Sequence, residues 1–342
     1  MKNIWLYSLR FYLKLGLFFY FKKFKVVGKE NIPRDKSLLV LGNHQSALID
    51  PLLLAVTFKQ FAHYLTRAGV FKKEFVSKLL NSINMLPVYR IRDGWSNLTN
   101  NNPVFEKCEQ LLHEKKIIVI FPEGSHNLKR TVRPLSKGFT RIILDTLEHY
   151  PDTDLHLLPV GFNYVDAVGF PDSASVYYGK PIRVKDLLSD DIHKNVITLK
   201  ETVHNELTKL TTHIPLDNYE KTLQKLEQHP VDFFNPIAVN TCIESNLENC
   251  DKSKKGKSFL EKLLKPLVYL NLFAPILFWR LVVKPKVKEL EFIATFRFAV
   301  AMVLVPLWLF IVAFVLLSFF GGQVALIYLV ASVLLMLGFV KA

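Results

Sequence analysis

The first residues that could do chemistry are a histidine and an aspartate, His44 and Asp50, in the segment GNHQSALIDP. In an unbroken helix, residues six positions apart lie about 120° apart around the axis, but a loop can bring them together. A histidine held and polarised by a carboxylate can act as a general base for a hydroxyl group. Pro51 favours a helix that starts there with Asp50 as its N-cap, so the segment alone also allows a capping aspartate beside an unrelated histidine.

A second candidate lies in IFPEGSH, where an apolar stretch ends in Glu123, Gly124 and Ser125. A buried strand that delivers a carboxylate, followed by glycine at a turn, suits an acceptor molecule that binds close to the backbone. Glu123 could instead cap the next turn. Basic residues follow the loop and could hold a phosphate, although such side chains are more often solvated; they are Lys129, Arg130, Arg133 and Lys137.

A third candidate is the pair Arg90 and Arg92 in LPVYRIRDG. Alternate residues of an extended segment point to the same side, so both guanidinium groups would face one way. Two arginines on one face can clamp a phosphate through bidentate hydrogen bonds. The same spacing is also compatible with two exposed arginines on an edge strand.

Other catalytic schemes lack their motifs in this chain. Ser125 follows a glycine but is not part of G-x-S-x-G, and the sequence has no Walker-type loop and no G-x-G-x-x-G. Three histidines and three cysteines show no spacing typical of metal ligands; they are His204, His213, His229, Cys108, Cys242 and Cys250. We therefore predict no metal centre and no disulfide framework, with unpaired thiols in a reducing compartment.

Short apolar runs at 38–41, 117–121 and 155–160 alternate with helical patterns at 51–58, 103–114 and 136–149. Continuous apolar strands interleaved with helices predict an α/β fold, in which helices cover both faces of a central, mostly parallel sheet. Functional residues of such sheets gather in the loops beyond the strand ends. The candidate residues above lie in such loops.

The net charge of +14 on 342 residues, half of them hydrophobic, excludes a disordered basic protein. Residues 1–36 contain nine basic and two acidic side chains, and residues 252–291 contain ten and three, whereas residues 37–251 are slightly acidic at about −2. A nucleic-acid-binding protein more often has a basic face across its folded domain. Basic segments beside the most hydrophobic stretches point instead to an anionic membrane surface.

The C-terminal residues 296–342 predict a transmembrane helical hairpin. Residues 298–320 contain no charge over 23 positions, and residues 324–340 continue the apolar pattern over 17; a helix needs roughly 20 apolar residues to cross a bilayer core. The sequence GGQ between them would form the turn. Basic residues near both outer ends, including Arg297 and Lys341, favour a cytoplasmic location for those ends. Buried core helices are the alternative.

Two further segments are expected at the membrane surface. Residues 1–25 combine aromatic side chains with Arg10 and Lys14, and predict an amphipathic helix in the headgroup layer or, alternatively, one packed on the protein. Residues 259–295 are basic and aromatic, with prolines and flanking lysines, which favours an interfacial segment over a crossing one. Residues 213–258 are polar and lysine-rich, and predict a helical linker.

Six segments occur in the order typical of the glycerolipid acyltransferase family, the PlsC-type lysophosphatidate and glycerol-3-phosphate acyltransferases, and the chain resembles that family over residues 26–182. The segments are VVGKENIP, NHQSALIDP, LPVYRIRDG, IFPEGSH, LLPVGFNY and VYYGKPI. By this resemblance, residues 26–212 form the acyltransferase domain.

The resemblance implies a role for each segment. His44 would be the catalytic base, oriented by Asp50, and Arg90 with Arg92 would bind the phosphate of the acceptor. Glu123 and Gly124 would take part in acceptor binding. In the segment LLPVGFNY, Pro159 would shape the part of the site that binds the acyl chain. In the family, the segment that corresponds to IFPEGSH commonly continues after Glu-Gly with Thr-Arg, whereas this chain has Ser125-His126. This departure leaves Arg130 or Arg133 to act as the basic partner in acceptor binding. Ser125 and Lys137 would be further contacts to the acceptor.

The spacing between histidine and aspartate is a second departure, because the family commonly has four intervening residues and this chain has five. The longer spacing resembles a branch of glycerol-3-phosphate and dihydroxyacetone-phosphate acyltransferases, which favours those acceptors over lysophosphatidate. We expect a membrane-bound enzyme with its catalytic domain on the cytoplasmic face, of the cell membrane if the source is bacterial. It would use acyl-CoA or acyl carrier protein as co-substrate, need no cofactor, bind an anionic bilayer and have no nucleic-acid partner.

Two alternatives come from other functional classes. The altered spacing is compatible with a non-catalytic lipid-binding protein on the same fold. A lipid hydrolase or transacylase would use water or a second lipid as the acceptor.

Overall fold

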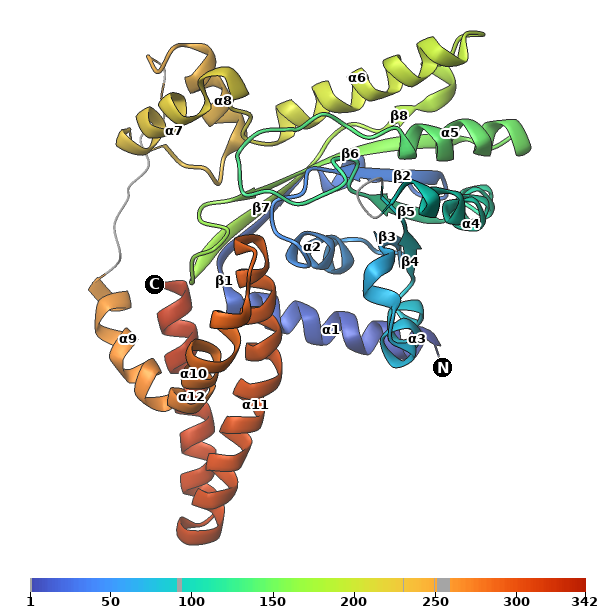
Figure 1. Cartoon of the computed structure of the whole chain (residues 1–342). Coiled ribbons are helices and arrows are strands. Elements are labelled where there is room, and N and C mark those ends of the chain that lie inside the picture. Colours follow the sequence, from blue (N-terminus) through green and yellow to red (C-terminus); the bar gives the residue numbers. More distant parts are fainter. Residues whose placement is uncertain (1, 91–93, 230, 249, 251–258) are drawn as a thin grey trace.

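A mixed β-sheet forms the centre of the region that precedes the C-terminal helices (Figure 1). The computed structural model describes residues 2–90, 94–229, 231–248, 250 and 259–342. Within them the sheet has the order β1-β7-β6-β2-β5-β3-β4, and β8 pairs with β6. The strands are β1 (Phe21–Val27), β2 (Ser37–Gly42), β3 (His63–Arg67), β4 (Met85–Val88), β5 (Ile117–Ile120), β6 (Leu155–Tyr164), β7 (Asp172–Tyr178) and β8 (Ile182–Arg183).

Most neighbouring strands run parallel, as the sequence predicted. β2 pairs in parallel with both β5 and β6, β3 pairs in parallel with β4 and β5, and β1 pairs in parallel with β7. Only the pairings of β6 with β7 and with β8 are antiparallel among the described strands. The predicted α/β fold with a mostly parallel sheet is therefore confirmed.

Helices cover both faces of the sheet (Figure 1). They are α1 (Lys2–Tyr20), α2 (Ile49–Thr57) and α3 (Glu74–Ser82) on one face, and α4 (Asn102–His113), α5 (Gly138–His149) and α6 (Ile192–Leu210) on the other. Along β2, Leu38 and Val40 pack into the first core, whereas Leu39 and Leu41 pack into the second. Because successive strand residues point to opposite faces, a strand buried on both sides has to be apolar throughout.

The predicted N-terminal helix is present but shorter than the segment 1–25. Helix α1 ends at Tyr20, and residues 21–27 form the edge strand β1, whose residues pair with β7 up to Val27 opposite Tyr177. The prediction was wrong for residues 21–25, because their backbone completes the sheet instead of continuing the helix.

The predicted linker at 213–258 is partly a small packed unit. Helices α7 (Tyr219–Gln228) and α8 (Pro236–Glu244) share an apolar core that includes Leu226, Phe233 and Val239. Apolar residues on these two short helices and on the segments beside them supply that core, which the overall polarity of the segment concealed. Residues 230, 249 and 251–258 of the predicted linker lie outside the described residues.

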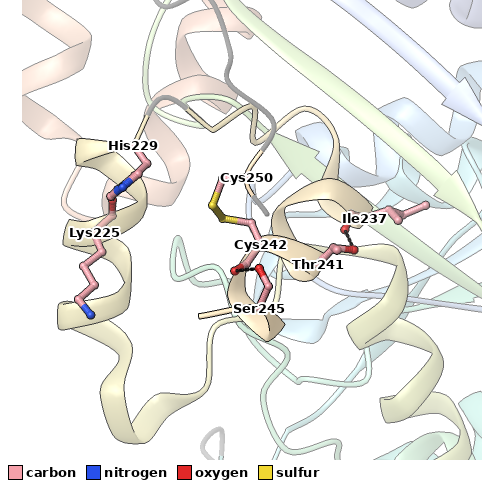
Figure 2. The surroundings of a disulfide bond; sticks show 7 residues. All are labelled: Lys225, His229, Ile237, Thr241, Cys242, Ser245 and Cys250. Atoms are coloured by element: carbon pink, nitrogen blue, oxygen red, sulfur yellow. Dashed lines mark hydrogen bonds between the residues drawn. A yellow bond between two sulfur atoms is a disulfide. The ribbon is translucent and has the colours of Figure 1, made fainter. Parts of the chain in front are cut away.

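Cys242 and Cys250 form a disulfide in this unit, which corrects the prediction of unpaired thiols (Figure 2). The chain reverses after α8 because Asn246 and Leu247 both have positive φ angles, of 52° and 75°. The Leu247 N–H then donates to the Cys242 carbonyl at 2.8 Å. This tight turn brings the two cysteines together although eight positions separate them. Cys108 remains a buried free thiol on α4, and burial raises its pKa to about 12.

The C-terminal region extends away from the sheet and its covering helices (Figure 1). Helices α9 (Phe259–Asn271) and α10 (Phe273–Phe278) meet at a bend of 90°, and a π-helical turn at Trp279–Val283 follows. The hairpin consists of α11 (Ile293–Phe320) and α12 (Gly322–Lys341). Among the described residues, two helices are long and apolar enough to cross a membrane, with mean hydropathies of 3.0 and 2.4, or three if the bent pair counts as one span.

Polar contacts join the base of the hairpin to α1. The Lys341 ammonium group donates to the carbonyls of Phe18 and Phe21, at 2.8 and 2.7 Å. The Arg297 guanidinium group donates to the Tyr20 hydroxyl and to the carbonyl of Val168. In Figure 1, α1 runs across the hairpin axis at the base of the domain. The two basic residues that flank the hairpin in the sequence thus attach it to the domain.

Candidate active site

His44 and Asp50 lie in direct contact just beyond the end of β2. The imidazole Nδ1 and the Asp50 Oδ2 are 2.7 Å apart, with 14% of the histidine side chain and none of the aspartate side chain exposed. The Asp50 N–H donates to the Ser46 carbonyl at 3.1 Å, and this turn returns the chain toward His44. The extra residue between the two side chains is therefore accommodated within the loop.

Asp50 is not the N-cap of the following helix, which corrects one prediction. Helix α2 begins at Ile49 with Leu48 as its N-cap, so Asp50 lies in the first turn. Its carboxylate points back into the loop and accepts the Ser46 N–H at 2.9 Å. The Tyr164 hydroxyl donates to the other carboxylate oxygen. Two donors besides the imidazole therefore fix the Asp50 carboxylate.

Tyr164 is a site residue that sequence reasoning missed. It is the last residue of β6 and is 1% exposed. Burial, with the nearby Asp50 charge, raises the pKa of the Tyr164 hydroxyl well above its ordinary value, so this hydroxyl remains a donor. The sequence signal that could have identified Tyr164 is a tyrosine at the end of an apolar strand, in GFNY. A buried tyrosine hydroxyl requires a hydrogen-bond partner, so such a residue is expected to contact a polar group near the strand end.

The geometry determines which histidine nitrogen is available for chemistry. Nδ1 faces the Asp50 carboxylate and donates to it in the neutral tautomer, so the lone pair lies on Nε2. The ring stacks on Phe121, with centroids 4.1 Å apart and planes 17° apart. The His44 carbonyl also accepts the Asn127 N–H at 3.0 Å, which joins this loop to the one after β5. The pair can therefore remove a proton from a hydroxyl presented to Nε2.

Glu123 lies in the loop after β5 and forms an ion pair with Arg133. The Arg133 Nε donates to the carboxylate at 2.6 Å, and 3% of the glutamate side chain and 21% of the arginine side chain are exposed. Burial raises the pKa of Glu123 and outweighs the opposing influence of Arg133. Gly124 has a φ of 71°, which permits the turn that places the carboxylate beside the arginine.

Arg133 also holds Ser125, so it shapes the loop. One of its terminal nitrogens donates to the Ser125 hydroxyl at 2.7 Å, and the other donates to the Ser125 carbonyl. Arg90 approaches the same loop from the segment after β4, and donates to the Gly124 carbonyl at 3.2 Å. The structure thus brings Arg90, Glu123 and Ser125 together around one loop, whereas Arg92 lies outside the described residues.

The other predicted contacts lie elsewhere. Lys137 is exposed at the start of α5, and Pro159 is buried within β6, opposite Leu41 of β2. The Arg130 guanidinium group donates to the carbonyls of Tyr164 and Val165, at 2.7 and 2.8 Å, and lies over the Phe233 ring. Burial lowers the pKa of Arg130. These contacts hold Arg130 between the end of β6 and the α7–α8 unit.

A cavity of about 570 Å³ lies between this unit and the catalytic loops. Gln45, Arg130 and Tyr164 line it, together with three carboxylates, which are Asp166, Glu227 and Asp232. His44, Asp50 and Glu123 are not among its lining residues. A wall with three carboxylates suits neither an acyl chain nor a phosphate, so we assign this cavity no part in the chemistry of His44.

The C-terminal region reaches the catalytic loop. The Thr295 hydroxyl, in the first turn of α11, accepts the Leu48 N–H at 3.1 Å, and Thr295 is 7% exposed. Ala294 and Phe298 of the same helix belong to the core beneath α2. The sequence predicted only membrane segments for the tail, because a contact between residues so far apart in the chain leaves no local pattern.

Comparisons with known proteins show similarity to acyltransferases, and the matched family model includes the loops described above. A family model described as Acyltransferase matches residues 23–163, which include His44, Asp50 and Glu123. A 1-acyl-sn-glycerol-3-phosphate acyltransferase of Borreliella burgdorferi is 28% identical over 39% of this chain and 51% of its own length. Glycerol-3-phosphate O-acyltransferase 1 of Saccharomyces cerevisiae is 27% identical over 40% of this chain and 17% of its own length. The chain therefore spans about half the length, or less, of these curated relatives.

Among solved structures, the 1-acyl-sn-glycerophosphate acyltransferase PlsC from Thermotoga maritima is similar, with a TM-score of 0.44 and 18% identity. The similarity covers 60% of this chain and 81% of that chain. The match to the family model contains the histidine and aspartate that the folded chain brings into contact. Residues 23–163 therefore match the Acyltransferase family model, and the chain is similar to curated 1-acyl-sn-glycerol-3-phosphate and glycerol-3-phosphate acyltransferases.

Proposed function

We propose that this protein is a membrane-bound acyltransferase that transfers a fatty acyl group from a thioester to a hydroxyl of glycerol 3-phosphate or dihydroxyacetone phosphate. The observation that supports it most is the contact between His44 and Asp50, beside the loop that contains Glu123 and Gly124. His44 Nε2 removes the hydroxyl proton while that oxygen attacks the thioester carbonyl. Asp50 holds the tautomer and stabilises the imidazolium ion.

The donor needs no activation by a covalent enzyme intermediate, because a thioester is already reactive. Acyl-CoA and acyl carrier protein both present such a bond. After attack, the thiolate leaves and takes up the proton held by His44. Arg90, near the Gly124 carbonyl, would contribute a positive charge for the acceptor phosphate.

A second candidate acceptor is 1-acylglycerol 3-phosphate. The printed name of the Borreliella relative supports it, as does that of a Mycoplasma pneumoniae relative at 29% identity, a probable 1-acyl-sn-glycerol-3-phosphate acyltransferase. The yeast relatives, named as glycerol-3-phosphate O-acyltransferases, support the first candidate. The five-residue spacing between His44 and Asp50 favours the smaller acceptors.

One membrane assay tests these alternatives together. Membranes that contain the full chain receive glycerol 3-phosphate, dihydroxyacetone phosphate and lysophosphatidate in parallel, each with acyl-CoA and with acylated carrier protein. We expect acylated glycerol 3-phosphate or dihydroxyacetone phosphate as the main product. Faster acylation of lysophosphatidate would show that lysophosphatidate, and not glycerol 3-phosphate or dihydroxyacetone phosphate, is the preferred acceptor. Free fatty acid without an acceptor would indicate a hydrolase, and lipid binding without turnover would indicate a non-catalytic protein.

The proposed location is a bilayer with anionic lipids, with the catalytic domain on the cytoplasmic face. Its support is the two apolar helices of the hairpin, the exposed aromatic residues of α1 and the basic residues at the base of the hairpin. The disulfide is unusual for that face, because cytosolic thiols are kept reduced. Sidedness therefore requires a direct test.

A single introduced cysteine decides the sidedness. Lys78 lies on α3 with 76% of its side chain exposed, so Lys78→Cys gives an accessible thiol on the catalytic domain. We expect a membrane-impermeant maleimide to label this variant in inside-out vesicles and not in right-side-out vesicles. The unmodified chain is the control for background labelling of Cys108, Cys242 and Cys250. Labelling only in right-side-out vesicles would place the domain on the opposite face.

A further inference from the structure

Three side chains of metal-ligand type come together from two distant parts of the chain. His126 follows the Glu123 loop, whereas Glu289 and Glu291 lie directly before α11. Their ligand atoms all lie within 4.8 Å of one another, and the His126 Nε2 is 3.8 Å from a Glu289 carboxylate oxygen. The sequence predicted no metal centre, because no local spacing connects a histidine to two glutamates in a later segment.

The glutamates belong to a fixed segment and not to a loose tail. A short 3₁₀ turn spans Leu290–Phe292, and the Phe292 ring meets the His126 ring edge-on with centroids 4.7 Å apart. Three residues later, Thr295 is tied to the catalytic loop through Leu48. Glu291 is half-buried and Glu289 is exposed. The two carboxylates and the imidazole therefore form a cluster at one edge of the active site.

The cluster lies close to His44 and to the loop that contains Glu123. The centroids of the His126 and His44 rings are 5.7 Å apart, and His126 follows the loop of Glu123 and Ser125. Arg133, a cation beside that loop, is engaged by Glu123 and Ser125. Two carboxylates beside a phosphorylated acceptor would repel it, unless a cation lay between them. A cation at this edge would offset the negative charge of the two carboxylates when an anionic substrate is bound.

We propose that His126, Glu289 and Glu291 bind a divalent cation of the Mn²⁺ or Mg²⁺ class, which in turn binds an oxygen of the acceptor phosphate. Carboxylates suit these hard cations, and one imidazole shifts the preference toward Mn²⁺. Three protein ligands leave positions of an octahedral ion open for water and phosphate oxygens. The phosphate part of the proposal rests on the proposed function, whereas the metal site itself does not.

A plain ion pair is the competing explanation. A protonated His126 could neutralise one glutamate without a metal, and the exposed Glu289 would remain solvated. The two explanations differ in what binds the protein. Only the metal site predicts stoichiometric binding of a cation that depends on all three residues.

Binding of Mn²⁺ alone provides the test. The full chain, purified in detergent without substrate, is titrated with Mn²⁺ and the free ion is followed by electron paramagnetic resonance. We expect about one equivalent to bind, and at least about tenfold weaker binding in the double variant Glu289→Gln, Glu291→Gln and in His126→Asn. Glu74→Gln is the matched control, because Glu74 is an exposed carboxylate paired with Lys78 on α3.

A thermal unfolding curve of each variant establishes that it is folded. Equal Mn²⁺ binding by the double variant, the control and the unmodified chain would overturn the proposal, as would the absence of binding at millimolar Mn²⁺. The result is independent of the acyltransferase assay, so a chain that binds Mn²⁺ but acylates nothing would contradict only the proposed function.

The kinetic arm tests the link to the phosphate. Chelation of divalent ions should raise the KM for glycerol 3-phosphate in the unmodified chain, and added Mn²⁺ should restore it. In the double variant, neither treatment should change the KM. A chain that is active and unaffected by chelation would contradict the metal role while it leaves the acyltransferase activity intact.

Discussion

The candidate active site is built from two regions that hold their polar groups in different ways. Within the sheet domain, Asp50 is fully buried and its carboxylate contacts His44, Ser46 and Tyr164. The C-terminal segment instead contributes the exposed Glu289 and the Thr295 hydroxyl, which accepts the Leu48 N–H of the catalytic loop. The first region is arranged by its own fold, whereas the second depends on how the hairpin is seated. Changes in the first should therefore abolish chemistry, and changes in the second should adjust it.

The largest effect is expected from His44→Ala. Loss of the general base should lower kcat by about 10² to 10⁴-fold, since proton transfer by a positioned side chain is worth that much. Membrane association should be unchanged, because α1 and the hairpin do not use this side chain. Acyl transfer is measured in membranes, and association is measured by sedimentation of those membranes.

His193→Ala is the control for this substitution, because His193 is exposed on α6, away from the catalytic loop. It should retain full activity. A His44→Ala variant with near-normal turnover would exclude the proposed base.

The second effect concerns stability. Arg133→Met removes the partner of a buried carboxylate and should lower the free energy of unfolding by about 3 kcal/mol. Glu123, whose pKa is already raised by burial, would be left more prone to protonation. Thermal unfolding in detergent gives the measurement.

Arg141→Met is the matched control for that change. Arg141 pairs with Asp145 on the surface of α5, with half of its side chain exposed, and such pairs contribute about 0.5 kcal/mol or less. Equal destabilisation by the two substitutions would mean that the Glu123–Arg133 pair is no more important than a surface pair.

Tyr164→Phe should have an intermediate effect on turnover. It removes one donor to Asp50 and, because hydrogen bonds to charged groups contribute roughly 1.5 to 3 kcal/mol, kcat should fall by about tenfold or more. The pH profile of kcat should also shift, because the carboxylate that orients His44 is less firmly held. The measurement is kcat as a function of pH.

Tyr178→Phe is the control that separates a positioning role of the Tyr164 hydroxyl from a purely structural one. Tyr178 is also buried, and its hydroxyl bonds to Thr57, away from His44. It should lower stability without a change in the pH profile. If both variants lost turnover equally with unchanged profiles, Tyr164 would be only a packing residue.

Sequence predicted the sheet domain better than the tail, for a physical reason. The strands around Leu39 and Ile118 are buried on both faces, so they are apolar throughout, and the loops after them contain His44 and Glu123. Tyr164 and Thr295 were missed because their partners lie far along the chain. The pairing of Cys242 with Cys250 was missed because it depends on left-handed backbone conformations at Asn246 and Leu247. An asparagine followed by a leucine does not predict two such conformations in succession.

The smallest effect is expected from Thr295→Val, and it tests whether the hairpin does more than anchor the enzyme. The valine keeps the shape of the side chain but removes the acceptor of the Leu48 N–H, at a cost of about 1 kcal/mol. Because Leu48 lies between His44 and Asp50, turnover should fall several-fold while membrane association stays complete. Thr295→Ser retains the hydroxyl and should retain turnover. If valine and serine behave alike, the contact is incidental, and the C-terminal region serves the active site only by holding it at the membrane.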